Sequence, residues 1–215
     1  MNEDVAEHRW AHAISGVFSP LIVPTYGVAI AMWLTSLRVL PESSRLLVTL
    51  IIAGITGLVP LAFIWGMKRM KLVTDTNVSV RQQRPLPMSI TMICYVAAGF
   101  FLYSVHAPFW LTWFFYGAAV ATGLAGIISI WWKISAHATA MGGLTGLLFW
   151  FAVAGIADVN SMALLSAGLI LSGAVCTCRI ILRCHSLSQT FAGFCLGIAS
   201  TFGLLALIWQ FIKPA

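Results

Sequence analysis

Residues 178–193 read CRIILRCHSLSQTFAG and hold Arg179, His185 and Gln189 in the pattern R-x5-H-x3-Q. Apolar segments long enough to cross a bilayer lie on both sides of this stretch. The stretch therefore lies at a membrane surface, where it brings together a cation, a histidine and a hydrogen-bonding side chain. Because polar groups in membrane proteins are costly unless they have a use, this combination suggests a site that handles phosphate.

Composition places the chain in the class of integral membrane proteins. Apolar residues make up 60% of its 215 residues and charged residues only 8%, which is far from the balance of a soluble domain. The length allows for six or seven helices of about 20 residues each and leaves almost no room for a soluble domain. We therefore predict an all-α polytopic transmembrane helix bundle that forms one domain over residues 1–215. The five cysteines show neither a disulfide framework nor zinc spacing, so we expect them to pack as small apolar residues.

The apolar segments define the predicted spans. The polar residues 1–12 lack the features of a signal peptide, so we expect them to remain on the mature protein. The first span contains Pro20 and Pro24, so a kinked or interfacial helix remains open there, and the sixth is short. We therefore expect six or seven spans, with charged residues outside them or at their edges. The segments cover residues 16–37, 46–67, 88–105, 109–132, 138–156, 162–178 and 190–211.

Alternation of the spans places three polar loops on one face of the membrane, together with the amino-terminal tail. These loops follow the second, fourth and sixth segments, at 68–87, at 133–137 and in the stretch quoted above. The excess of basic residues on this face fits a convergent cationic site. It also fits the bias of lysine and arginine towards cytoplasmic loops, and we expect a bacterial inner membrane. Nine of the 12 basic residues lie on this face: Arg9, Lys68, Arg69, Lys71, Arg81, Arg84, Lys133, Arg179 and Arg183.

The polar loops contain the groups needed to transfer a phosphoryl group through a covalent histidine intermediate. That reaction needs cations around the phosphate oxygens, a nucleophile on one side and an acid that protonates the leaving alcohol. His137 directly precedes a span and His185 lies just before the last one, where the positive end of a helix favours an anion. Ser186 or Ser188 can cap the last helix. Guanidinium groups suited to phosphate oxygens are available from Arg81, Arg84 and Arg179.

These clusters resemble the three-part signature of the type 2 phosphatidic acid phosphatase superfamily, the lipid phosphate phosphatases related to vanadium haloperoxidases. The first family motif, K-x6-R-P, survives here as Arg84-Pro85, with Asn77 where the family has lysine. The second motif, P-S-G-H, keeps its serine and histidine in residues 134–137, which read ISAH.

The third family motif, S-R-x5-H-x3-D, keeps its arginine and histidine at the family spacing, whereas Gln189 replaces the aspartate. The resemblance covers residues 77–189. It implies that His185 is the nucleophile and that His137 is the general acid. It implies neither a metal nor a cofactor. The phosphate ligands that it implies are Arg84, Ser135 and Arg179, with Arg81 replacing the charge of the lysine and Lys133 close enough to touch the phosphate.

Gln189 leaves two classes of function open. An aspartate beside a nucleophilic histidine fixes the tautomer and stabilises the cation, whereas a glutamine orients the ring without adding charge. Asp75, in the first loop, could supply the missing charge. The chain is thus expected to be a lipid phosphate phosphatase or phosphotransferase, or an impaired relative that binds or transports an anionic lipid. A haem-binding bundle is disfavoured because axial ligands normally project from within spans, whereas His137 and His185 begin theirs.

The partner implied by the resemblance is a membrane lipid that carries a phosphate or a diphosphate, and no nucleic acid is expected. The candidate lipids are polyprenyl diphosphate, phosphatidic acid, phosphatidylglycerol phosphate and the phosphates of lipid A. Members of the family usually open their site away from the cytoplasm, whereas the charge bias favours the cytoplasm. The sequence therefore leaves the facing of the site open, and it predicts no oligomeric state.

Overall fold

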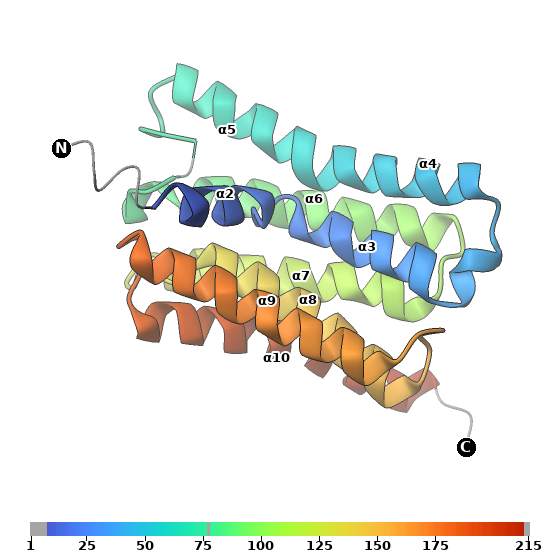
Figure 1. Cartoon of the computed structure of the whole chain (residues 1–215). Coiled ribbons are helices and arrows are strands. Elements are labelled where there is room, and N and C mark those ends of the chain that lie inside the picture. Colours follow the sequence, from blue (N-terminus) through green and yellow to red (C-terminus); the bar gives the residue numbers. More distant parts are fainter. Residues whose placement is uncertain (1–7, 77, 213–215) are drawn as a thin grey trace.

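The computed structural model describes residues 8–76 and 78–212, and the regular elements in them are helices. They pack side by side into a bundle (Figure 1). A π-helical turn at Gly54–Leu58 joins α4 and α5 into one rod. The helices are α2 (Arg9–Val17), α3 (Val23–Leu34), α4 (Glu42–Ala53), α5 (Val59–Arg69), α6 (Pro85–Ser104), α7 (Phe109–Ile128), α8 (Ala136–Ala154), α9 (Ser161–Ile181) and α10 (Leu187–Ile212).

Six helical rods among the described residues are long and apolar enough to cross a membrane, each 19 to 28 residues in length. They correspond to the predicted segments from the second to the seventh. The chain is thus an all-α, multi-pass membrane protein, as its composition predicts. The rods are Glu42–Arg69, Arg81–Ser104, Phe109–Ile128, Ala136–Ala154, Ser161–Ile181 and Leu187–Ile212.

The first predicted span, residues 16–37, is not one continuous helix. The helix α2 ends at Val17 and α3 begins at Val23, with irregular chain between them. The break lies at Pro20, whose ring provides no backbone N–H, and the Tyr95 hydroxyl donates to the carbonyl oxygen of Pro20 at 2.9 Å. With 12 residues, α3 is about 18 Å long and is too short to cross the hydrocarbon core alone.

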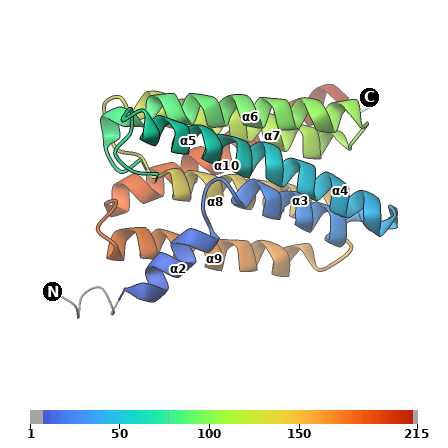
Figure 2. The same ribbon diagram turned by 90° about the horizontal axis from the view of Figure 1, so that it is seen from above.

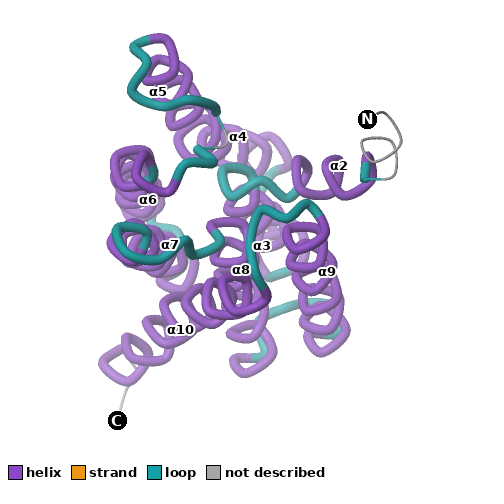
Figure 3. The backbone as a smooth tube through the Cα atoms, turned by 90° about the vertical axis from the view of Figure 1, so that its left-hand side faces the viewer, coloured by secondary structure: helices purple, strands orange, loops and turns teal. Residues whose placement is uncertain are grey.

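The polar loops gather at one end of the bundle, as alternation predicts. Figure 3 looks onto this end, which holds the connections α5–α6, α7–α8 and α9–α10 as well as α2. Hydrogen bonds join the connections to one another. Arg84 donates from a terminal nitrogen to the carbonyl oxygen of Ile134 at 2.7 Å. The Ser135 N–H donates to the carbonyl oxygen of Gln189 at 3.3 Å.

Glycines bring α8 and α10 into backbone contact just below this polar end. A Cβ atom on Gly142 would lie 2.2 Å from the carbonyl oxygen of Phe194, and one on Gly197 would lie 2.1 Å from that of Thr139. Small residues at helix interfaces allow this close approach in membranes. The contact fixes the beginning of α8, which carries His137, against the beginning of α10, which follows His185.

Candidate functional site

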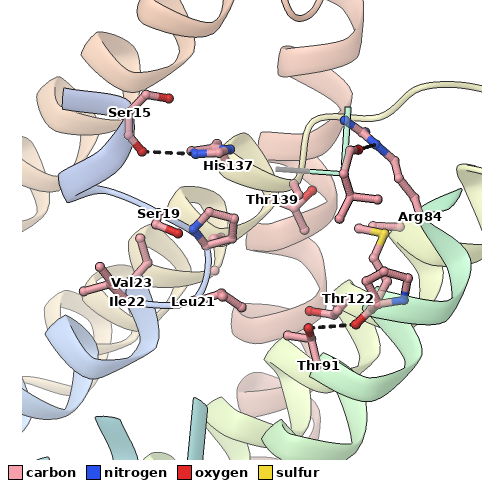
Figure 4. Close-up of a pocket in the computed structure, with 18 of the residues that line it drawn as sticks. Ser15, Ser19, Leu21, Ile22, Val23, Arg84, Thr91, Thr122, His137 and Thr139 are labelled. Atoms are coloured by element: carbon pink, nitrogen blue, oxygen red, sulfur yellow. Dashed lines mark hydrogen bonds between the residues drawn. The ribbon is translucent and has the colours of Figure 1, made fainter. Parts of the chain in front are cut away.

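A cavity of about 600 Å³ opens at the polar end and is lined by four of the predicted site residues. The four side chains come from four different parts of the chain. Arg84 precedes α6 and His137 lies in the first turn of α8, while Arg179 lies in the last turn of α9 and His185 in the connection to α10. Figure 4 shows Arg84 and His137 on two sides of this cavity. The fold therefore brings together residues that are up to 101 positions apart in the sequence.

Arg84 is buried and holds two loops together at the cavity wall. Its side chain is only 7% exposed. The Nε group donates to the carbonyl oxygen of Val78 at 3.1 Å, and a terminal nitrogen donates to that of Ile134. These bonds use two of the five N–H groups of the guanidinium. Its positive charge is thus fixed in place while further donors remain for an anion.

The hydrogen bonds of His185 determine which ring nitrogen carries the proton. Its Nδ1 atom lies 3.2 Å from the carbonyl oxygen of Lys133 and 3.2 Å from Oε1 of Gln189. The Ser186 N–H also donates to Oε1, at 3.2 Å, which identifies this atom as the amide oxygen. Because both partners of Nδ1 are acceptors, Nδ1 carries the proton and Nε2 keeps its lone pair.

The charge state of His185 follows from its surroundings. Burial, followed by the positive charges of Arg84 and Arg179, lowers the pKa of His185 below its usual value. The bond to Gln189 acts in the opposite direction and is outweighed. The ring is therefore neutral at neutral pH, the form in which Nε2 can act as a nucleophile.

Ser15 binds two of the site residues and was not identified from the sequence. Its hydroxyl accepts a hydrogen bond from a terminal nitrogen of Arg179 at 2.7 Å. Its carbonyl oxygen accepts one from Nε2 of His137 at 3.1 Å, so this nitrogen carries a proton. The Nε atom of Arg179 is buried and has no partner among the described residues. Ser15 lies in α2, more than 120 positions before its partners, and no local pattern marks it.

Three further residues that were predicted to bind phosphate do not line the cavity. Ser135 is fully buried and caps α8 by accepting from the N–H of Ala138 at 3.4 Å. Lys133 contributes its backbone carbonyl oxygen to His185. Arg81 donates to the carbonyl oxygens that follow α7, those of Ser129 at 3.4 Å and of Ile130. These residues hold the connections around the cavity.

Gln189 lies behind His185 and has a second structural role. Its Oε1 accepts from the Ser186 N–H, and the Ser186 hydroxyl accepts from the Gln189 N–H at 3.4 Å. This reciprocal pair is a capping box of the form S-x-x-Q, readable in residues 186–189. The same side chain thus begins α10 and orients the imidazole of His185.

The sequence analysis also named two residues of the first polar loop, Asp75 and Asn77. Asp75 accepts from the N–H of Ser79 at 3.2 Å and from its hydroxyl at 3.2 Å, so it shapes the loop. It makes no hydrogen bond to His185 among the described contacts. Asn77 lies outside the described residues.

The charge in the cavity suits an anion. Its fixed positive groups are two arginines, and within residues 8–76 and 78–212 no three histidine, cysteine or acidic side chains gather as metal ligands would. Guanidinium groups pair well with phosphate oxygens. Comparison with known proteins adds no assignment, because no family model, curated protein or solved structure matches this chain.

Proposed function

We propose that the protein removes phosphate from a membrane lipid phosphate or diphosphate through a phosphohistidine intermediate, or transfers that phosphate to an acceptor. The observation that carries the proposal is one cavity in which a neutral His185 with its lone pair on Nε2 lies near Arg84, Arg179 and His137. A nucleophile, two cations and a second imidazole are the groups that this chemistry needs.

In the first step, the lone pair of His185 Nε2 attacks phosphorus while the bond from phosphorus to the alcohol oxygen breaks. The leaving oxygen takes a proton from His137, whose imidazolium form is stabilised by the phosphate anion bound in the cavity. Because the Nε2 proton of His137 is bound by the Ser15 carbonyl oxygen, Nδ1 is the donor to the leaving oxygen. Arg84 and Arg179 offset the negative charge on the phosphate oxygens.

In the second step, a water molecule attacks the phosphohistidine and gives its proton to His137. Inorganic phosphate leaves, and the lone pair returns to His185. If another alcohol attacks instead of water, the phosphate is transferred to it. Throughout the cycle, Gln189 and the Lys133 carbonyl oxygen keep the proton of His185 on Nδ1.

The test is phosphate release from a panel of lipid phosphates by the detergent-purified protein, with EDTA present. We expect release by the wild type and its loss in His185→Ala. A lipid labelled at phosphorus should leave an acid-labile, base-stable label on the wild type only. The control is His106→Asn at the opposite end of the bundle, since asparagine tolerates the positive φ of 56° at that position. Wild-type activity in His185→Ala would remove His185 as the nucleophile.

One observation favours a second function, binding or transport of an anionic lipid without hydrolysis. Both acceptors on Nδ1 of His185 are uncharged, so no carboxylate among the described residues is hydrogen-bonded to the ring to stabilise the positive charge that develops in the reaction. On this alternative, Arg84 and Arg179 hold the phosphate and no bond breaks. Saturable binding of a lipid phosphate by wild type and by His185→Ala, without phosphate release by either, would support it.

A further inference from the structure

Below the arginines and histidines, the cavity continues into the membrane-spanning part of the bundle. It passes Thr91 on α6 and Thr122 on α7, and it reaches as far as Tyr95 and Phe114. The helix rises about 10 Å from Arg84 to Thr91. The group attached to a phosphate bound at Arg84 would therefore lie beside these threonines.

This level of the cavity carries hydroxyl-bearing residues among apolar side chains such as Leu21, Met88 and Ala118. Hydroxyl groups of Thr91, Thr122 and Thr139 line it from three helices, and Ser19 lines it from the connection between α2 and α3. Figure 4 shows Ser19 on the α2–α3 side, across the cavity from Thr91 and Thr122. Polar groups without partners are costly in an apolar medium. A cavity that held only a hydrocarbon chain at this level would have no use for these hydroxyl groups.

The hydroxyl groups differ in whether they already donate a hydrogen bond within the protein. Thr91 and Thr139 each donate to the backbone carbonyl four residues before them, at 2.9 and 3.0 Å, so they can only accept from a ligand. Within the described part of the chain, no hydrogen bond of the Thr122 or Ser19 side chain is formed with another residue. These two can both donate and accept. A ligand that forms hydrogen bonds with all four hydroxyl groups must therefore both donate and accept hydrogen bonds.

We propose that the alcohol carrying the phosphate bears free hydroxyl groups, as a sugar or a glycerol headgroup does, and that Thr122 and Ser19 select it. This inference rests on the proposed function. A ligand hydroxyl can accept from Thr122 and donate to Thr91 at the same time. The ester carbonyls of phosphatidic acid only accept, and an isoprenoid chain does neither. A site built to hydrogen-bond a hydroxyl discriminates strongly against an analogue that lacks it.

The test measures kcat/KM for four phosphomonoester lipids: one on a sugar headgroup, one on a glycerol headgroup, phosphatidic acid and a polyprenyl phosphate. We expect the full-length wild type to prefer one or both hydroxyl-bearing substrates by about tenfold or more. Thr122→Val, which keeps the side-chain volume, should lower this ratio about tenfold. Ser19→Ala on the opposite wall should lower it in the same direction.

The matched control is Thr112→Val, the same change on the same helix at a side chain that does not line this cavity. It should leave all four values unchanged. The relative activity on the sugar and glycerol substrates identifies which headgroup is used. A wild type that prefers polyprenyl phosphate or phosphatidic acid, or a Thr122→Val variant that slows all four substrates equally, would overturn the inference while the proposed function stands. Release from none of the four would overturn the inference, and release from no lipid diphosphate either would refute the proposed function as well.

Discussion

At the scale of single residues, the uncharged side chain of Gln189 is the feature that matters most for the proposed chemistry. The glutamine satisfies both geometric demands at this position, since it closes the capping box with Ser186 and accepts from Nδ1 of His185. It supplies no negative charge. His185 therefore has its pKa lowered by burial and by two arginines, with only hydrogen bonding to oppose them. Hydrogen bonds therefore orient the ring of His185, but Gln189 adds no charge that would stabilise its positive form.

Gln189→Glu is expected to raise turnover and to move the acid limb of the pH–rate profile to higher pH. Glutamate keeps the length and both hydrogen bonds of glutamine but adds a charge that stabilises the imidazolium form, so the pKa of His185 rises. Protonation removes the lone pair of Nε2, and in the variant this begins at a higher pH than in the wild type. The measurement is kcat/KM across the acid range.

Gln83→Glu is the control for this variant, because it changes the net charge equally at a side chain outside the cavity wall, where Gln83 accepts from Thr74. Its acid limb should coincide with that of the wild type. If the limb of Gln189→Glu also stays in place, protonation of His185 does not control the rate.

At the scale of elements, α2 is the part of the structure that the sequence described least well. Its residues were predicted partly as a tail and partly as a span, yet they form a separate helix beside α9 (Figure 2). Trp10 and Val17 are about half exposed, whereas Ser15 is buried. The break at Pro20 allows α2 to turn away from α3 and to place Ser15 against His137 and Arg179. The helix thus completes one wall of the cavity.

Ser15→Ala is expected to raise KM for a lipid phosphate about tenfold, with a smaller effect on kcat. The variant loses the acceptor that holds Arg179 but keeps the carbonyl oxygen that binds His137. A hydrogen bond to a charged group contributes about 1.5–3 kcal/mol, which is enough for such a change. Val17→Ala, an exposed position on the same helix, should behave as the wild type. A fall in KM would show instead that the Ser15 hydroxyl competes with phosphate for Arg179.

At the scale of the whole molecule, the site depends on how the helices meet. His137 and His185 lie on separate elements, and the Ser135 N–H binds the carbonyl oxygen of Gln189 between them. This arrangement needs α8 and α10 at the distance that Gly142 and Gly197 allow. The packing of two spans therefore controls the geometry of groups at the membrane surface.

Gly197→Ala is expected to destabilise the protein by about 1–3 kcal/mol or more and to lower its activity. The added methyl would lie 2.1 Å from the carbonyl oxygen of Thr139, and backbone atoms can relieve the clash only if the helices separate. Gly203→Ala on the same helix meets no atom within 4 Å and is the matched control. Thermal unfolding in detergent and phosphate release measure the two effects. Equal melting temperatures for the two variants would contradict the tight contact.

The sequence by itself determined the helical class, the long apolar segments from the second to the seventh, and the gathering of the polar loops at one face. These features follow from hydropathy, segment length and alternation, which are local properties of the chain. The polar clusters were also expected to converge at one face, and Arg84, His137, Arg179 and His185 from these clusters line one cavity. The break near Pro20 was left open because proline is tolerated near the beginning of a span.

Only the tertiary structure decided which side chains line the cavity. Arg81, Lys133 and Ser135 have the residue types that bind phosphate, yet the Arg81 guanidinium, the Lys133 carbonyl oxygen and the Ser135 hydroxyl oxygen hold the surrounding connections. Ser15 lies at the site because α2 folds against the bundle, and Thr122 faces the cavity because of the rotation of α7. Such contacts join residues far apart in the chain. Their geometry depends on helix packing and rotation, which local sequence patterns do not specify.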